Sequence, residues 1–132
     1  MEPIKKHYLN IIVNHVTTDG VAPVNKTVTY KTVLTSISGA SKCWITSNLG
    51  ATNEAVSATD DTEDASGWYW QFNHKNGFKH SATTRTPSTW TKTVASPVQD
   101  WQPANDPCTI ELGLGWRIPN LQEWTAVRNT NG

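Results

Sequence analysis

The sequence predicts an α+β fold, mostly β with one or two short helices. Three observations support this class. Thr, Ser and Asn are abundant while only 17% of residues are charged, which favours strands over helices. Residues 26–37 alternate like a half-buried strand, and a helix-capping sequence begins at Asn120. With 132 residues, the chain is predicted to be a single domain, 1–132, with one buried core.

Two strands are predicted in the first part of the chain. Residues 8–16 are β-prone and mostly apolar, as in a strand. In residues 26–37, Val28, Tyr30 and Thr32 occupy alternate positions, and the positions between them hold Thr or Lys. Because successive side chains of a strand point to opposite faces, this alternation predicts one buried and one exposed face.

The middle of the chain predicts shorter strands separated by long loops. Residues 42–49 and the aromatic segment 67–72 are interpreted as strands, with a polar loop over 50–66 between them. Residues 73–107 contain four Pro and one Gly and are predicted to be loops, and a loop region of this length is typical of functional segments. Residues 113–118 are predicted to be a further short strand.

A short amphipathic helix is predicted after residue 119. Asn120 can cap it, and Glu123 stands at the third helical position, which is the capping-box arrangement. Leu121, Trp124 and Val127 share one helical face. An apolar face this close to the last residue requires a partner surface, so we expect self-association through this helix or further strands beyond it.

The chain contains seven Trp residues, several times the usual share. Because Leu and Ile are few, core packing is predicted for Trp44, Trp70, Trp116 and Trp124. Trp90 and Trp101 lie in the loop-rich region and are candidate ligand contacts. Trp68 shares a strand face with Trp70, and a pair of aromatic rings on one face can stack on a sugar, so Trp68 is a third candidate.

The acidic segment around residue 60 is a candidate calcium loop, with Asp60, Asp61 and Asp64 as possible ligands. It lacks the EF-hand spacing, so a solvated loop is the favoured interpretation. His74 and His80 lie close in sequence, but a zinc site requires three or four ligands. We therefore expect no metal and no cofactor.

Charge and motifs exclude several classes of protein. Eleven basic residues balance eleven acidic ones and form no basic stripe, so no nucleic-acid partner is expected. No apolar run reaches the length of a bilayer span, so no membrane insertion is expected. The sequence lacks a nucleophile elbow, a His-Glu-x-x-His motif and a phosphate loop, so it is not expected to be an enzyme. Its only cysteines, Cys43 and Cys108, are compatible with one disulfide or with two buried thiols.

Three ordered motifs resemble a known bacterial family. They are Lys-Cys-Trp-Ile-Thr-Ser-Asn-Leu-Gly at 42–50, Gly-Trp-Tyr-Trp-Gln-Phe-Asn at 67–73, and Asp-Pro-Cys at 106–108 followed by Gly-Trp-Arg-Ile-Pro-Asn-Leu-Gln-Glu-Trp at 115–124. Together they resemble the Fibrobacter succinogenes major paralogous domains, and the last motif also resembles formylglycine-generating-enzyme-like domains. The resemblance covers a core of 42–128, preceded by N-terminal strands in 1–41 and followed by a tail, 129–132.

The resemblance implies a C-type-lectin-like fold, completed in the family by strands and loops beyond the Glu-Trp helix. It also implies a disulfide between Cys43 and Cys108 and an extracellular or cell-surface location in a gut-type bacterium such as the Bacteroidetes. The expected function is a non-catalytic binding module for a glycan or protein ligand. The alternatives are a structural domain of an adhesin, pilus-like or tail-fibre protein, or a ligand-display protein diversified by retroelements.

Overall fold

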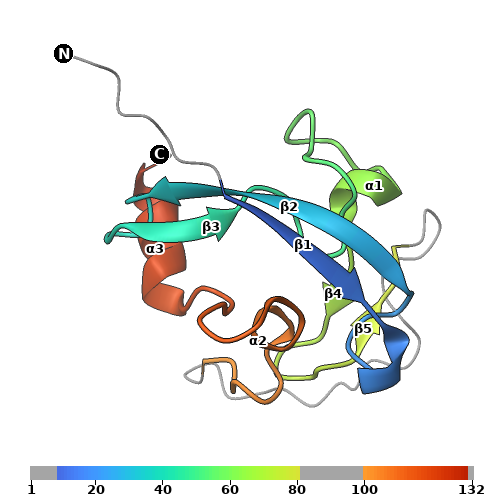
Figure 1. The fold of residues 1–132 in the computed structure, drawn as a ribbon. Helices are drawn as coiled ribbons and strands as arrows, with labels where there is room; N and C mark the ends of the chain where they lie inside the picture. The colour runs from blue at the N-terminus through green and yellow to red at the C-terminus, as the bar shows by residue number, and fades with distance from the viewer. Residues whose placement is uncertain (1–8, 81–99, 131–132) are drawn as a thin grey trace.

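The computed structural model describes residues 9–80 and 100–130 (Figure 1). Within them the chain forms one three-stranded and one two-stranded antiparallel sheet, together with short helices. The predicted α+β class is therefore confirmed at this level. No helix in the described part of the chain is both long and apolar enough to cross a bilayer.

The larger sheet has the order β1-β2-β3, with β1 at Asn10–His15, β2 at Lys26–Thr35 and β3 at Lys42–Ile45. The long central strand β2 runs between its two neighbours in Figure 1. The two predicted N-terminal strands are confirmed, with ends shifted by one or two residues. The third strand is shorter than its predicted range, 42–49, because the chain turns after Ile45.

The predicted alternation of β2 is also confirmed. Val28, Tyr30 and Thr32 are buried, while the three residues between and before them are exposed. Val28 and Tyr30 form the core with Leu49. Partly buried residues packed against this core are Ile11, Val13, Ile45, Trp70, Cys108 and Leu112.

Two elements in the second half of the chain differ from the prediction. Helix α2, Pro107–Leu112, was not predicted, although Asp106 followed by Pro107 is a common start for a helix. The strand predicted over 113–118 is not formed. Gly113 and Gly115 have φ values of 97° and 95°, which lie outside the β region, so this segment turns instead of extending.

The aromatic segment 67–72 forms only the two-residue strand β4, Tyr69–Trp70, paired with β5, Gly77–Phe78. A helical turn, α1 at Glu63–Ser66, precedes it, and a short 3₁₀ turn, η1 at Thr17–Asp19, follows β1. The hairpin places Trp68 and Trp70 close to the core, with their rings 6.2 Å apart.

Helix α3, Leu121–Thr130, begins with the predicted capping box. The Glu123 N–H donates to Asn120 Oδ1, and the Asn120 N–H donates to Glu123 Oε2, each over 2.9 Å. Its apolar face is only partly covered, since Leu121 is 72% and Trp124 50% exposed. The prediction that Trp124 belongs to the core is therefore wrong for this structure.

A buried polar chain crosses the core beneath the sheet. The Gly50 N–H donates to the Tyr30 hydroxyl over 2.8 Å, and this hydroxyl lies 2.7 Å from His15 Nε2. The other ring nitrogen, Nδ1, contacts the Glu111 carboxylate. Burial raises the pKa of Tyr30 to about 12, so its hydroxyl stays protonated at neutral pH and can donate to the imidazole.

We expect Tyr30→Phe to lower the free energy of unfolding by about 2–3 kcal/mol, because it leaves the buried His15 ring nitrogen and the Gly50 N–H without partners. Urea unfolding followed by circular dichroism measures the change. The matched control is Thr29→Val, which removes an exposed hydroxyl from the same strand and keeps the β-branch. Equal stability of the two variants would contradict this role for the buried chain.

Candidate functional site

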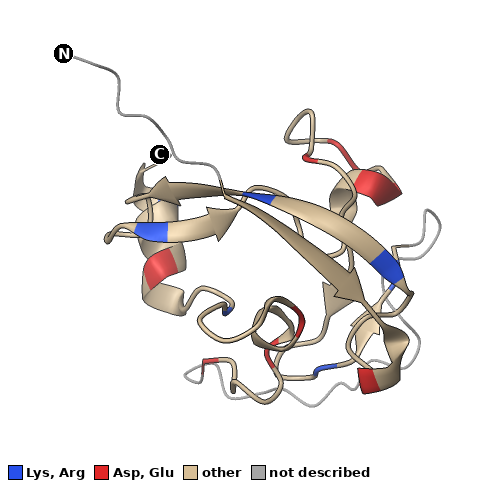
Figure 2. Cartoon of the chain, in the orientation of Figure 1, with Lys and Arg blue, Asp and Glu red and all other residues tan. Residues whose placement is uncertain are grey.

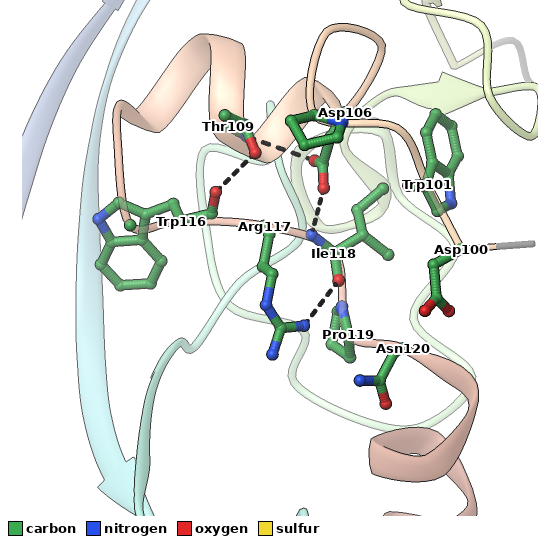
Figure 3. A pocket seen from close by; sticks show the side chains of 11 residues that line it. Asp100, Trp101, Asp106, Thr109, Trp116, Arg117, Ile118, Pro119 and Asn120 are labelled. Carbon is green, nitrogen blue, oxygen red and sulfur yellow. Dashed lines mark hydrogen bonds between the residues drawn. The ribbon is translucent and has the colours of Figure 1, made fainter.

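An open pocket with a volume of about 560 Å³ lies beside the start of α2, between residues 100–106 and 115–120 (Figure 3). We call it the first pocket. In Figure 3, Trp101 and Asp100 stand on one side of it and Trp116 on the other, with Arg117 and Asn120 between them. The residues therefore combine indole rings with polar side chains around one hollow, a combination typical of small-molecule sites.

The walls of the first pocket are joined by the carboxylate of Asp106, which is 2% exposed. Its Oδ1 accepts the backbone N–H groups of Cys108 and Thr109 at the start of α2. Its Oδ2 accepts the N–H of Ile118 over 2.8 Å, so the same side chain also holds the segment 115–119. The Thr109 hydroxyl donates to the Trp116 carbonyl over 2.7 Å and closes the loop between them.

Arg117 is paired inside the protein. Its guanidinium donates two hydrogen bonds to Glu123, of 2.8 and 2.7 Å, and Lys42 Nζ lies 3.6 Å from the same carboxylate. The Arg117 hydrogen bonds lower the pKa of Glu123 to about 2. Elsewhere, the basic and acidic segments are scattered over the fold in Figure 2, and neither sign gathers on one side in that view.

Asp100 and Trp101 of the first pocket are available to a ligand. Asp100 is exposed, and its carboxylate has no hydrogen-bond partner among the described residues. Trp101 is half-buried, and its ring packs edge-on against Phe72 with the centroids 5.4 Å apart. This contact fixes the indole in place while part of its surface still faces the pocket.

A second pocket, with a volume of about 480 Å³, runs along β3. All four residues of β3 line it, and the segment 115–119 forms its opposite wall, so this segment separates the two pockets. Trp44 and Trp124 meet edge-on in the second pocket, with ring centroids 5.8 Å apart. Its lining is more apolar than that of the first pocket, with Leu112 and Ile118 among its residues.

The three candidate ligand-binding tryptophans have different positions. Trp101 lines the first pocket. Trp68 is 7% exposed and packs edge-on against the buried His15 ring, so the prediction that it contacts a ligand is wrong, and it is a core residue instead. Trp90 lies outside the described residues.

The acidic loop is held by its own hydrogen bonds. The Asp60 carboxylate accepts from the N–H groups of Val56 and Thr62 and from the Thr62 hydroxyl, which lower its pKa. Of the weak calcium candidates, Asp60 and Asp61 therefore lie in a loop that closes on itself, and Asp64 lies in α1. Within residues 9–80 and 100–130, no group of three His, Cys, Asp or Glu side chains is arranged to hold a metal ion.

The disulfide implied by the family resemblance is not formed in the structure, where Cys43 and Cys108 are both free. They nevertheless line the same second pocket. Cys43 is exposed, whereas burial raises the pKa of the Cys108 thiol to about 12. The structure thus contains two free thiols, but the alternative of two buried thiols is wrong for Cys43, which is exposed.

Most of the first pocket was not predicted from the sequence. Asp106 and Arg117 occur in the motifs that resemble the family, but no role was predicted for them. Asp100 was not predicted to belong to a site, because an isolated charged residue in a loop carries no chemical pattern. A signal existed for Asp106, since Asp followed by Pro marks a helix start and therefore a fixed side chain.

No protein-family model, no curated protein and no solved structure matches this chain. The resemblance to the major paralogous domains therefore stays a prediction.

The two thiols should differ in reactivity toward iodoacetamide at pH 7.5. Cys43 is expected to react readily, whereas Cys108 should react at least about a hundredfold more slowly, because the reactive species is the thiolate and the high pKa suppresses it. Mass spectrometry of quenched time points measures both rates, and the urea-unfolded chain is the control. Equal rates in the folded protein, or a native mass two hydrogens lighter, would contradict the prediction.

The Arg117–Glu123 pair predicts a loss of stability in acid. Because the folded pKa of Glu123 is lowered from 4.5 to about 2, its stabilisation is complete above pH 4.5 and is lost as the pH falls toward 2. Allowing for the solvent around the half-exposed guanidinium, we expect a loss of about 1–2 kcal/mol. Urea unfolding at pH 7, 4 and 3 tests this, with Glu123→Gln expected to show a shallower decline. Parallel pH profiles for the two proteins would count against it.

Proposed function

We propose that the protein is a non-catalytic binding module that holds a glycan in the first pocket. The observation that carries the proposal is the fixed, partly exposed ring of Trp101 beside the exposed carboxylate of Asp100, which accepts no hydrogen bond from the described residues. A sugar has an apolar ring face that packs on an indole and hydroxyl groups that donate to a carboxylate. In the first pocket, Trp101 can pack on the sugar ring and Asp100 can accept hydrogen bonds from its hydroxyl groups.

The charges around the first pocket favour a neutral, hydroxylated ligand. The charge of Arg117 is neutralised by Glu123, and the carboxylate oxygens of Asp106 already accept hydrogen bonds from three backbone N–H groups. Neither is available to bind a charged ligand. The carboxylate of Asp100 repels anions, and the Asn120 amide, whose oxygen caps α3, can offer its N–H₂ group to a hydroxyl.

The proposed function is non-catalytic because of the positions of the potentially reactive side chains. The chain of Glu111, His15 and Tyr30 has the order of a proton relay, but His15 and Tyr30 are both fully buried, out of reach of a ligand. In the first pocket, the Thr109 hydroxyl donates to the Trp116 carbonyl, and the neighbouring Asp106 carboxylate already accepts three backbone N–H groups.

The family assignment and the location belong to the same proposal. Antiparallel sheets with a few short helices are compatible with the C-type-lectin-like fold of the family that the motifs resemble. Such domains are displayed outside the cell, where glycans are abundant. The proposed source is therefore a secreted or surface protein of a gut-type bacterium.

A second candidate function is a structural or ligand-display domain of an assembly such as an adhesin, pilus-like or tail-fibre protein. The observation that favours it is the apolar face of α3, where Leu121 and Trp124 remain exposed. Light scattering of the wild type and of Leu121→Glu tests this function. Self-association that the substitution abolishes would support it, and a monomer at every concentration would oppose it.

The glycan proposal predicts that Trp101→Ala lowers affinity on a glycan array at least about tenfold, because the stacking surface is removed. Asp100→Asn is a milder variant that changes an exposed side chain and should weaken binding without affecting folding. Trp124→Ala is the matched control, since this indole does not line the first pocket. Binding that is absent in the wild type, or lost equally in the control, would overturn the proposal.

A further inference from the structure

No strand within the described residues pairs with β3 on the side away from β2. The Thr46 N–H donates to the Lys31 carbonyl, and these residues lie in the same register as the pairs Trp44–Val33 and Lys42–Thr35. In an antiparallel pair, hydrogen-bonded and non-bonded positions alternate. The backbone groups of Cys43 and Ile45 therefore point away from β2, and no backbone hydrogen bond within the described residues satisfies them.

The second pocket lies along this edge. Successive side chains of a strand point to opposite faces, so a hollow lined by all four residues of β3 must extend along the side of the strand. The segment 115–119 stands across the hollow. The four residues of β3 span about 13 Å, a length that a short extended peptide can follow.

We propose that the second pocket binds an extended peptide of a partner protein, which adds a fourth strand to the sheet beside β3. The outward backbone groups of Cys43 and Ile45 would supply the hydrogen bonds, as in recognition by strand addition. This binding is separate from that of a glycan in the first pocket and does not require it.

The lining of the pocket specifies the peptide. On the face shared with Ile45, the added strand meets Cys108 and Leu112, which favours apolar residues at alternate positions. On the other face it meets Trp44 and Lys42. The charged residues of the pocket are Lys42, Arg117 and Glu123, which leave one net positive charge, so an acidic residue is favoured on this second face.

Amide hydrogen exchange tests the geometry directly. The probe is a capped peptide of about seven residues that alternates valine and threonine and carries one glutamate in place of a threonine. We expect the amides of Cys43 and Ile45 to exchange rapidly in the free protein and slowly with the peptide, while those of Lys42 and Trp44 are protected in both. Cys43 and Ile45 amides that are protected in the free monomer, or unchanged by saturating peptide, would overturn the proposal.

Affinity measurements by calorimetry distinguish backbone hydrogen bonding from non-specific hydrophobic binding. The same peptide with a central proline should bind at least about tenfold more weakly, because proline lacks an N–H and disrupts the added strand. Replacing its glutamate with lysine should also weaken binding. Equal affinities for the three peptides would contradict the proposal.

Two variants of the protein complete the test. Cys43→Pro removes an outward N–H and leaves the pairing of Lys42 and Trp44 with β2 in place, so it should weaken binding, whereas Cys43→Ala should not. Lys42→Glu should reverse the preference between the glutamate and lysine peptides, and it remains informative if the proline variant does not fold. If the exchange protection of the Cys43 and Ile45 amides rises with protein concentration alone, a second copy of the chain occupies the edge of β3. This result would overturn the proposal of a partner peptide.

Discussion

The buried carboxylate of Asp106 is the contact on which the rest of the candidate site depends. It caps α2 through two backbone N–H groups and holds Ile118 through a third. The segment that it fixes, 115–119, is a wall of both pockets. A single side chain thus couples the segment 100–106, the short helix α2 and the segment that separates the two pockets. An unpaired carboxylate at this depth would be costly, so the three bonds act together.

The hydrogen-bonded chain of His15, Tyr30 and Glu111 has a comparable role for the core. It connects β1, β2 and α2, elements that lie far apart in the sequence, and it includes the Gly50 backbone. Besides aliphatic residues, this interior contains Tyr30, Trp68 and a buried imidazole. Buried polar atoms require hydrogen-bond partners in well-defined positions. The hydrogen-bonded chain therefore favours one specific packing of these elements as well as stabilising it.

The two pockets suit different ligands because their polar groups differ. The first has an indole beside an exposed carboxylate and the amide of Asn120, and these groups are compatible with ligand hydroxyls. The second has an open strand edge with apolar and aromatic walls, which suits another polypeptide. Since the segment 115–119 belongs to both, a displacement of this wall by one ligand would alter the space available to the other.

The sequence by itself determined the strands β1 and β2 and the capping box of α3, because each depends on residues close together in the chain. The alternation of Val28, Tyr30 and Thr32 and the pair Asn120 and Glu123 carry that local information. Only the tertiary structure decided that Trp68 is buried, that Trp101 lines a pocket and that residues 113–118 form no strand. Burial and strand pairing depend on neighbours distant in the sequence, and a residue pattern does not specify which neighbours those are.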